Sequence, residues 1–109
     1  MDAKEAFAER DSLHVLDVRE PFEWDLGHVA GSIHIPIQEI QHRASELPTD
    51  KPLLCVCTVG ARSEYVAGVL RAAGFEAENL EGGLVTWQGE GFPLVKDDGG
   101  EADVWKGPH

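Results

Sequence analysis

The chain has 109 residues, of which 42% are hydrophobic and 27% are charged, which suits one domain around one hydrophobic core and excludes a disordered chain. Nine basic and twenty acidic side chains give a net charge of −11, and such a surface repels nucleic acid and anionic membranes. The apolar stretches are too short to span a bilayer, and the amino terminus has no apolar signal-peptide region, so the cytoplasm is the expected location.

The first third of the chain alternates helix and strand. The pattern over Asp2–Arg10 predicts a helix, capped by its first residue with Glu5 completing a capping box. The apolar run Leu13–Val18 predicts a strand that is buried on most sides. A helical turn is expected over Glu20–Leu26, because Pro21 is well suited to a first helical position.

The middle of the chain continues the alternation. Ser32–Ile35 is predicted to form a short strand, and Gln38–Leu47 a helix, because apolar residues recur there at helical spacing. The continuous apolar run Pro52–Val56 is typical of a central strand that is covered on both faces of a parallel sheet.

The last elements repeat the same order. Arg62–Ala73 is predicted to be an amphipathic helix that ends at Gly74, and Phe75–Leu80 a further strand. A final helical segment is expected after the turn at Gly82 and Gly83. Strands that alternate with helices throughout favour a parallel sheet with helices on both faces.

The pattern fades after Pro93, so the predicted domain covers residues 1–93 and an acidic tail covers residues 94–109. Trp105 is the exception in this tail. Either it holds the tail against the domain, or the tail is mobile, which is the commoner behaviour of such segments.

Cysteine and histidine usage gives no sign of a disulfide framework or a metal centre. Cys55 and Cys57 are too few for a disulfide scaffold, and residues two apart are poorly placed to bridge each other. No cysteines and histidines have zinc-like spacing, so no metal or other cofactor is predicted. Each histidine is expected to be structural or solvated; the five are His14, His28, His34, His42 and His109.

The segment Cys57–Ser63 joins the carboxyl end of the predicted central strand to the next helix, at the edge where ligands bind in open α/β sheets. The helix amino terminus there offers free N–H groups and roughly half a positive charge. A tight loop can direct successive N–H groups at one point, Gly60 permits the backbone conformation that this needs, and Arg62 adds a fixed positive charge. The acidic chain repels anions at long range, so an anion site has to be built locally in this way.

A cysteine that faces such a loop should be a thiolate at neutral pH. A thiolate can attack the outer sulfur of a donor and keep it as a persulfide, which the same N–H groups would stabilise. The competing interpretation is that Cys57 is only a small buried residue, and the loop pattern by itself does not decide between the two. Cys55 lies inside the apolar run and is assigned to the core.

Four segments resemble the single-domain rhodaneses, which are sulfurtransferases. Cys57-x-x-Gly60-x-Arg62-Ser63 resembles their active-site loop. The other three segments are Asp17-Val18-Arg19-Glu20 with Glu23 and Gly27-His28-Val29-Ala30-Gly31-Ser32, then Ile35-Pro36, and finally Leu80-Glu81-Gly82-Gly83 with Trp87. Their order and spacing agree over roughly residues 1–93. Val56, where many relatives carry an aromatic residue, and the tail depart from the family pattern, and neither disturbs the loop.

The resemblance implies an α/β/α sandwich with a central parallel sheet of about five strands. It implies that Cys57 accepts the sulfur. We also predict that Arg62 assists by holding the anionic part of the donor, because it supplies a fixed positive charge and a planar set of donors. The residues implied to surround the bound sulfur are Thr58, Val59, Gly60, Ala61, Arg62 and Ser63. Asp17 and Arg19 are implied to lie beside this loop, where we expect them to form an ion pair that holds the strand end. His28 and Glu23 are expected to be structural.

The resulting expectation is a thiosulfate sulfurtransferase that passes sulfur from a donor such as thiosulfate to cyanide, a thiol or a protein. A sulfur carrier would use the same residues, and some rhodanese-like modules only bind partners, although those often lack the cysteine. Phosphatases and arsenate reductases of this fold resemble C-x5-R, whereas Cys57 and Arg62 are spaced C-x4-R. The tighter loop fits one sulfur atom better than three phosphate oxygens. The physiological donor and acceptor stay open.

Overall fold

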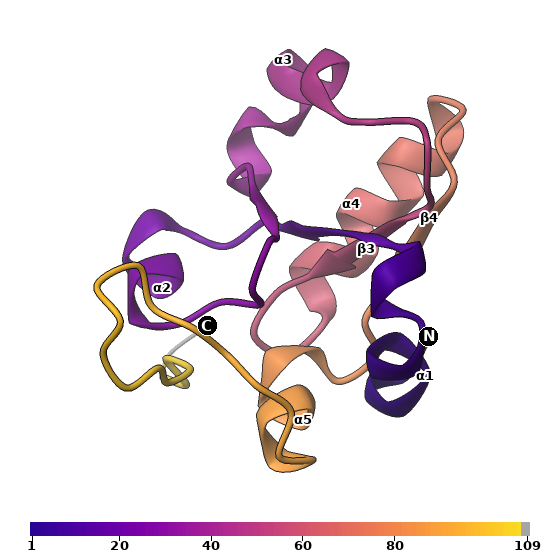
Figure 1. Cartoon of the computed structure of the whole chain (residues 1–109). Helices are drawn as coiled ribbons and strands as arrows, with labels where there is room; N and C mark the ends of the chain where they lie inside the picture. The colour runs from indigo at the N-terminus through magenta and orange to yellow at the C-terminus, as the bar shows by residue number, and fades with distance from the viewer. Residues whose placement is uncertain (108–109) are drawn as a thin grey trace.

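Four short parallel strands form the sheet at the centre of residues 1–107, the part of the chain that this computed structural model describes (Figure 1). The strands are β1 (His14–Asp17), β2 (Ile33–His34), β3 (Leu53–Val56) and β4 (Ala77–Asn79). Their order in the sheet is β2–β1–β3–β4, and every neighbouring pair is parallel. The predicted parallel α/β architecture is therefore confirmed. Of the five histidines, His109 lies outside the described residues.

The number of strands is four rather than the five that the resemblance implied. Each of the four runs predicted from the sequence forms one strand. Val95 does not join the sheet, since it meets His28 only in a single antiparallel bridge. The amino-terminal residues form helix instead, so among residues 1–107 no segment is left to supply a fifth strand.

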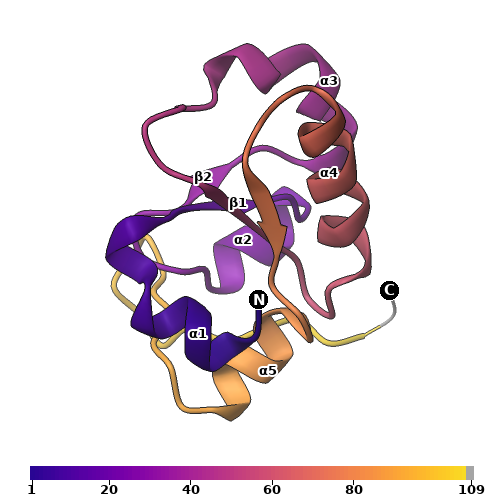
Figure 2. The same ribbon diagram turned by 90° about the vertical axis from the view of Figure 1, so that its right-hand side faces the viewer.

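Helices cover both faces of the sheet (Figures 1 and 2). On one face lie α1 (Ala3–Ala8) and α5 (Gly83–Gly89), and on the other lie α3 (Ile40–Arg43) and the long α4 (Ala61–Ala72). Helix α2 (Pro21–Leu26) follows β1, and three short 3₁₀ segments complete the fold: η1 (Arg10–Ser12), η2 (Ile37–Glu39) and η3 (Ala44–Glu46).

Strand β3 is buried on both sides, as its uninterrupted apolar sequence predicted. Its residues alternate between the two layers, because successive side chains of a strand point to opposite faces. Leu54 and Val56 pack in the cluster with α1 and α5. Leu53, Cys55 and the next residue, Cys57, pack in the cluster with α3 and α4. The two cysteines therefore lie under the same helical layer.

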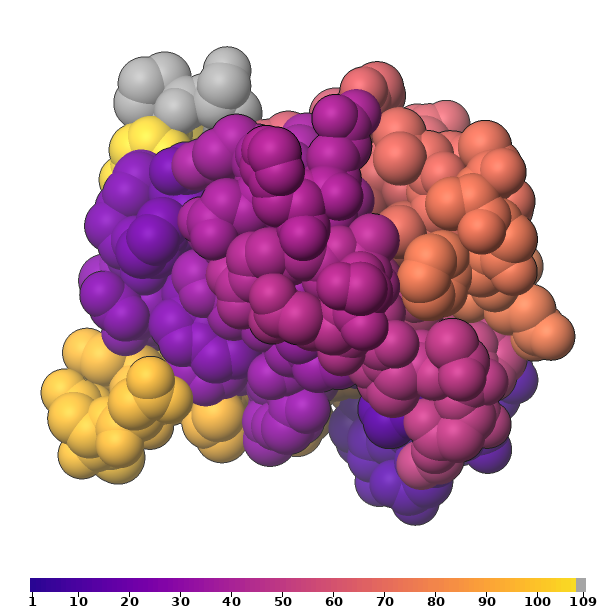
Figure 3. All heavy atoms as spheres, turned by 90° about the horizontal axis from the view of Figure 1, so that it is seen from above, coloured from indigo at the N-terminus to yellow at the C-terminus, as the bar shows by residue number. Residues whose placement is uncertain are grey.

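The helix expected over Gln38–Leu47 is interrupted. The structure has η2, α3 and η3 in its place, and the magenta residues of this segment cover much of the face seen in Figure 3. The apolar pairs Ile37/Ile40 and Ala44/Leu47 are each three residues apart, which is the period of a 3₁₀ turn. In both pairs the later N–H donates to the earlier carbonyl, so burying these pairs favours 3₁₀ geometry at both ends.

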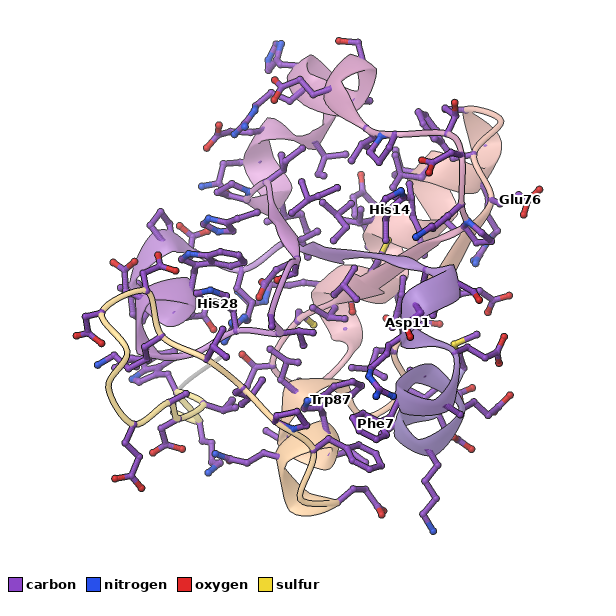
Figure 4. The ribbon with its side chains drawn as sticks, in the orientation of Figure 1. Phe7, Asp11, His14, His28, Glu76 and Trp87 are labelled. Carbon is purple, nitrogen blue, oxygen red and sulfur yellow. The ribbon has the colours of Figure 1, made fainter. Side chains whose placement is uncertain are left out.

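Aromatic and apolar contacts attach α1 to α5 and the last residues to α2. Phe7 and Trp87 meet edge to face with centroids 5.7 Å apart, as Figure 4 shows. Val104 is 3% exposed and belongs to the cluster under α1 and α5. The rings of Trp105 and Phe22 of α2 meet edge to face with centroids 5.0 Å apart, so Trp105 contacts the domain. No helix within residues 1–107 is long and apolar enough to cross a membrane.

Candidate active site

Cys57 begins a short loop between β3 and α4, at the carboxyl edge of the sheet. Gly60 is the residue before α4, and its φ of +101° is a left-handed conformation that a β-carbon would resist. This turn folds the loop back over Cys57. The first turn of a 12-residue helix, with its free N–H groups, therefore faces the sulfur.

Three hydrogen-bond donors converge on the sulfur of Cys57. The Gly60 N–H lies 3.1 Å from Sγ, the Ser63 N–H 3.4 Å and the Ser63 hydroxyl oxygen 3.3 Å. The side chain of Cys57 is 0% exposed, so the sulfur lies beneath the loop rather than at its surface. An anion on this atom would be held by donors that are already in place.

The hydroxyl of Ser63 carries a single proton, for which the Cys57 sulfur, Oδ1 of Asn79 and the Gly60 carbonyl compete. Its oxygen is 2.5 Å from Oδ1 of Asn79 and 3.3 Å from Sγ of Cys57. Asn79 also donates from Nδ2 to the carbonyl of Gly60 at 3.2 Å. Asn79 therefore ties the end of β4 to the loop, a role that the sequence analysis missed. The only signal was its place at the end of a strand, since the carboxyl ends of parallel strands share one edge.

Arg62 forms an ion pair with Glu23 of α2. Its Nη1 donates to Oε1 of Glu23 at 2.8 Å and its Nη2 to Oε2 at 2.9 Å. Thr58 is fully buried, and its hydroxyl donates to the same Oε2 at 2.9 Å. From the sequence we expected the guanidinium of Arg62 to hold the negative charge of the sulfur donor. In the structure this guanidinium is paired with the Glu23 carboxylate.

Glu23 is only 1% exposed, yet its surroundings favour the ionised form. Burial alone would raise its pKa, but hydrogen bonds from Arg62, the Glu20 backbone and Thr58 outweigh this and lower the pKa of Glu23 to about 2. The Glu20 N–H donates to Oε1 at 3.1 Å, at the point where Pro21 starts α2. The start of α2 thus fixes the carboxylate that faces Arg62.

A second ion pair closes the end of β1. Arg19 and Asp17 are both 0% exposed, and Nη2 of Arg19 lies 2.8 Å from Oδ2 of Asp17 and 2.7 Å from the carbonyl of Gly27. His28 contacts the Trp24 carbonyl through Nδ1 at 2.9 Å and Asp97 through Nε2 at 3.2 Å. Figure 4 shows His28 between α2 and the carboxyl-terminal segment.

The first residues of α5 form hydrogen bonds with the backbone of the loop. The Leu84 N–H donates to the Cys57 carbonyl at 2.9 Å, and the Val85 N–H to the Thr58 carbonyl at 3.0 Å. Gly83 lies so close that a β-carbon there would collide with the Thr58 carbonyl. The turn Leu80–Gly83, which resembles the closing signature of the rhodaneses, therefore leads into the residues of α5 that bond to the loop backbone.

The remaining predicted site residues are divided by exposure. Val59 at the tip of the loop is 49% exposed, and Ala61 is exposed. Cys55 is 0% exposed inside β3, where burial raises the pKa of its thiol to about 12. The two cysteines thus share a helical layer but differ in their polar surroundings. Within residues 1–107, no group of three histidine, cysteine, aspartate or glutamate side chains is placed to hold a metal ion.

Comparison with known proteins places this architecture in one family. The model of the rhodanese-like domain family matches residues 2–90. A rhodanese-related protein from Thermoplasma volcanium superposes with a TM-score of 0.85 at 37% identity, over 87% of this chain and 95% of that one. A sulfurtransferase from Allochromatium vinosum is 31% identical over 93 residues, which cover 84% of this chain and 87% of that protein.

Another relative is longer than this chain. The Bacillus subtilis protein named "Putative sulfur carrier protein YrkF" is 36% identical over 91 residues, which cover 79% of this chain and 49% of that protein. The chain therefore spans about half the length of this relative. With a family match over most of its length and a solved structure of the same fold, the chain belongs to the rhodanese-like domain family.

Proposed function

We propose that this protein is a sulfurtransferase that moves a sulfane sulfur from a donor such as thiosulfate to a thiophilic acceptor through a persulfide on Cys57. The observation that carries the proposal is the convergence of three donors, from Gly60 and Ser63, on Sγ of Cys57 at the amino terminus of α4. The same donors can hydrogen-bond to the attacking thiolate and to the persulfide that it forms.

The proposed reaction has two halves. The Cys57 thiolate attacks the outer sulfur of thiosulfate, a new S–S bond forms, the old S–S bond breaks, and sulfite leaves with the electron pair. An acceptor such as cyanide then attacks the outer sulfur of the persulfide, and the thiolate returns. Because Cys57 is fully buried, we expect the loop at Val59 and Gly60 to open before a donor reaches the sulfur.

Three features argue against phosphatase or arsenate reductase chemistry. The loop is one residue shorter than C-x5-R, the donors that contact Cys57 surround a single atom, and the Arg62 fork is occupied by Glu23. A tetrahedral oxyanion needs donors for three oxygens and a free guanidinium.

The second candidate is a sulfur carrier, and the name of the Bacillus subtilis relative favours it. A carrier would form the same persulfide on Cys57 and would deliver it to a partner protein. The two functions differ only in donor and acceptor. The acidic surface, with a net charge of −11, supports a protein or neutral thiol partner over a free dianion.

The test is turnover by matched variants. We expect the wild type to convert thiosulfate and cyanide into sulfite and thiocyanate, and Cys57→Ala to lose this activity entirely. Cys55→Ala is the control, because it removes an equally buried sulfur from the same layer and should keep the activity. Turnover by Cys57→Ala at the wild-type rate would refute the proposal, whereas loading of Cys57 without delivery to cyanide would favour the carrier.

A further inference from the structure

The positive charge beside the candidate nucleophile is already neutralised. Both terminal nitrogens of Arg62 contact the two oxygens of Glu23, at 2.8 and 2.9 Å. The hydrogen bond to Glu23 raises the pKa of Arg62, and the charges of Glu23, Cys57 and Asp17 raise it further. Nη2 of Arg62 also donates to the Thr58 hydroxyl at 3.2 Å, so the guanidinium lies beside the residue that follows Cys57, and it is paired there with a carboxylate.

The side-chain charges beside the loop cancel. Glu23 balances Arg62, and Asp17 balances Arg19 in a pair that is 0% exposed. Nη1 of Arg19 is buried without a hydrogen-bond partner within residues 1–107. The groups that contact the Cys57 sulfur are the amides of Gly60 and Ser63 and the Ser63 hydroxyl, which can hold one sulfur but carry no full positive charge. The chain as a whole has a net charge of −11.

We propose that Glu23 is a positioning residue that sets donor specificity, because its pairing with Arg62 disfavours dianionic donors such as thiosulfate and favours hydropersulfides of the form R–S–SH. This inference rests on the proposed sulfur transfer through Cys57. With a hydropersulfide, the thiolate attacks the terminal sulfur, a new S–S bond forms, the S–S bond of the donor breaks, and the leaving thiolate R–S⁻ takes the proton. The products are the Cys57 persulfide anion and R–SH, with no further reactant.

The two donors place different demands on the site. Thiosulfate brings two negative charges and releases sulfite, also a dianion, whereas a hydropersulfide brings at most one charge to the reacting end. A carboxylate beside the site repels the first donor more strongly than the second. Removing one charge at this range is expected to raise the rate of loading by thiosulfate about 10-fold relative to that by a hydropersulfide.

The experiment measures sulfur loading of Cys57 in a single turnover, by mass spectrometry of quenched protein. The donors are thiosulfate and the hydropersulfide of 2-mercaptoethanol, and the readout is the ratio of their second-order loading rates. Glu23→Gln keeps the size of the side chain and removes its charge, so the ratio of thiosulfate to hydropersulfide should rise about 10-fold. Glu23→Asp keeps the charge and should keep the wild-type ratio even if both rates fall.

Asp25→Asn is the matched control. Asp25 lies on the same helix, is exposed and forms no ion pair within residues 1–107, so its loss changes the net charge equally. We expect it to leave the ratio near the wild-type value, because solvent and salt screen an exposed charge. A general loss of structure in Glu23→Gln would lower both rates together and would leave the ratio unchanged.

If Glu23→Gln does not fold, a second variant tests whether Glu23 sets donor specificity. Glu23→Gln/Arg62→Gln removes both charges and leaves neither partner buried alone, so the proposal predicts the wild-type ratio. A selective loss of thiosulfate loading in this double variant would show that Arg62 holds the donor anion despite Glu23, and would overturn the inference. So would an unchanged ratio in folded Glu23→Gln. If neither donor loads Cys57 in the wild type, the proposed function itself fails, which is a different result.

Discussion

Cys55 and Cys57 differ in what surrounds each sulfur, although both are fully buried under the same helical layer. The sulfur of Cys57 receives three hydrogen-bond donors from the loop that covers it. Cys55 is enclosed within β3, where burial raises the pKa of its thiol to about 12. Opening one short loop would expose Cys57, whereas exposing Cys55 requires the sheet to separate from α4.

This contrast predicts selective alkylation. Brief treatment of the folded protein with iodoacetamide near neutral pH should label Cys57, and Cys55 should react only after unfolding. Peptide mapping after quenching measures both rates in one sample. The Cys55→Ala variant should take up label as fast as the wild type. Comparable labelling of both cysteines in folded protein would show that the loop gives Cys57 no advantage.

Glu23 predicts a specific dependence of stability on pH. Its pKa is lowered from 4.5 to about 2 in the folded protein, so its ionised form stabilises the fold above about pH 4.5 and this contribution is lost as the pH falls toward 2. We expect the difference in unfolding free energy between wild type and Glu23→Gln to shrink by about 3 kcal/mol over this range. Urea unfolding at a series of pH values measures it, and a difference that is constant with pH would contradict the buried ion pair.

At the scale of elements, local signals predicted helix ends better than contacts between elements. The Glu5 N–H donates to Asp2 at 2.8 Å, and α2 starts at Pro21, as their sequence patterns indicated. The pairing of Arg62 with Glu23 joins residues 39 positions apart, and no periodic pattern encodes such a contact. Glu23 appeared in the sequence analysis only through the resemblance, and its partner became visible only in the fold.

The interrupted helix over Gln38–Leu47 also shows what local sequence patterns do not predict. Apolar spacing correctly indicated a helical segment after Pro36, but spacings of three and four residues are too similar to separate 3₁₀ from α geometry. The loop Cys57–Ser63 was easier to predict, because a short connection with a glycine between a strand and a helix has few possible conformations. What the sequence could not supply was the support beneath the loop, which comes from α5 and Asn79.

The contact between α5 and the loop leads to a prediction for Gly83. Its φ is +64°, and a β-carbon would collide with the Thr58 carbonyl, so Gly83→Ala should destabilise the protein by more than about 1 kcal/mol and slow sulfur transfer. Gly89→Ala is the control, since Gly89 is also in α5 and a β-carbon there would meet open space. That variant should be neutral or slightly stabilising. Thermal unfolding and turnover of both variants check this, and equal behaviour would mean that the loop does not depend on the close approach.

At the scale of the whole molecule, the segment after Pro93 contributes to the fold. Val104 is buried among residues of α1 and α5, and the Asp103 N–H donates to the Leu26 carbonyl at 2.9 Å. We therefore expect a chain that ends at residue 93 to lose about 2–4 kcal/mol of stability, from the burial of Val104 and the contact of Trp105 with Phe22. A chain that ends at residue 105 keeps both contacts and should unfold like the full chain. If the two truncated chains were equally stable, residues 94–105 would be a dispensable tail.

The charge distribution links the molecule to its proposed chemistry. An acidic protein whose site carries two balanced ion pairs offers an incoming sulfur donor a set of N–H groups and little net positive charge. Such a site suits the transfer of a single sulfur atom between thiols. The position at which sulfur is bound therefore decides whether Cys57 is the acceptor.

The most direct measurement is to map that sulfur. Protein purified without reductant is treated with thiosulfate or a hydropersulfide, alkylated, digested and analysed by mass spectrometry. We predict a gain of one sulfur atom on the peptide at Cys57, with none at Cys55, and its removal by cyanide or by a thiol. Cys57→Ser should gain no sulfur under the same conditions. Sulfur bound at Cys55, or a wild-type protein that gains none from either donor, would contradict the assignment of Cys57 as the sulfur acceptor.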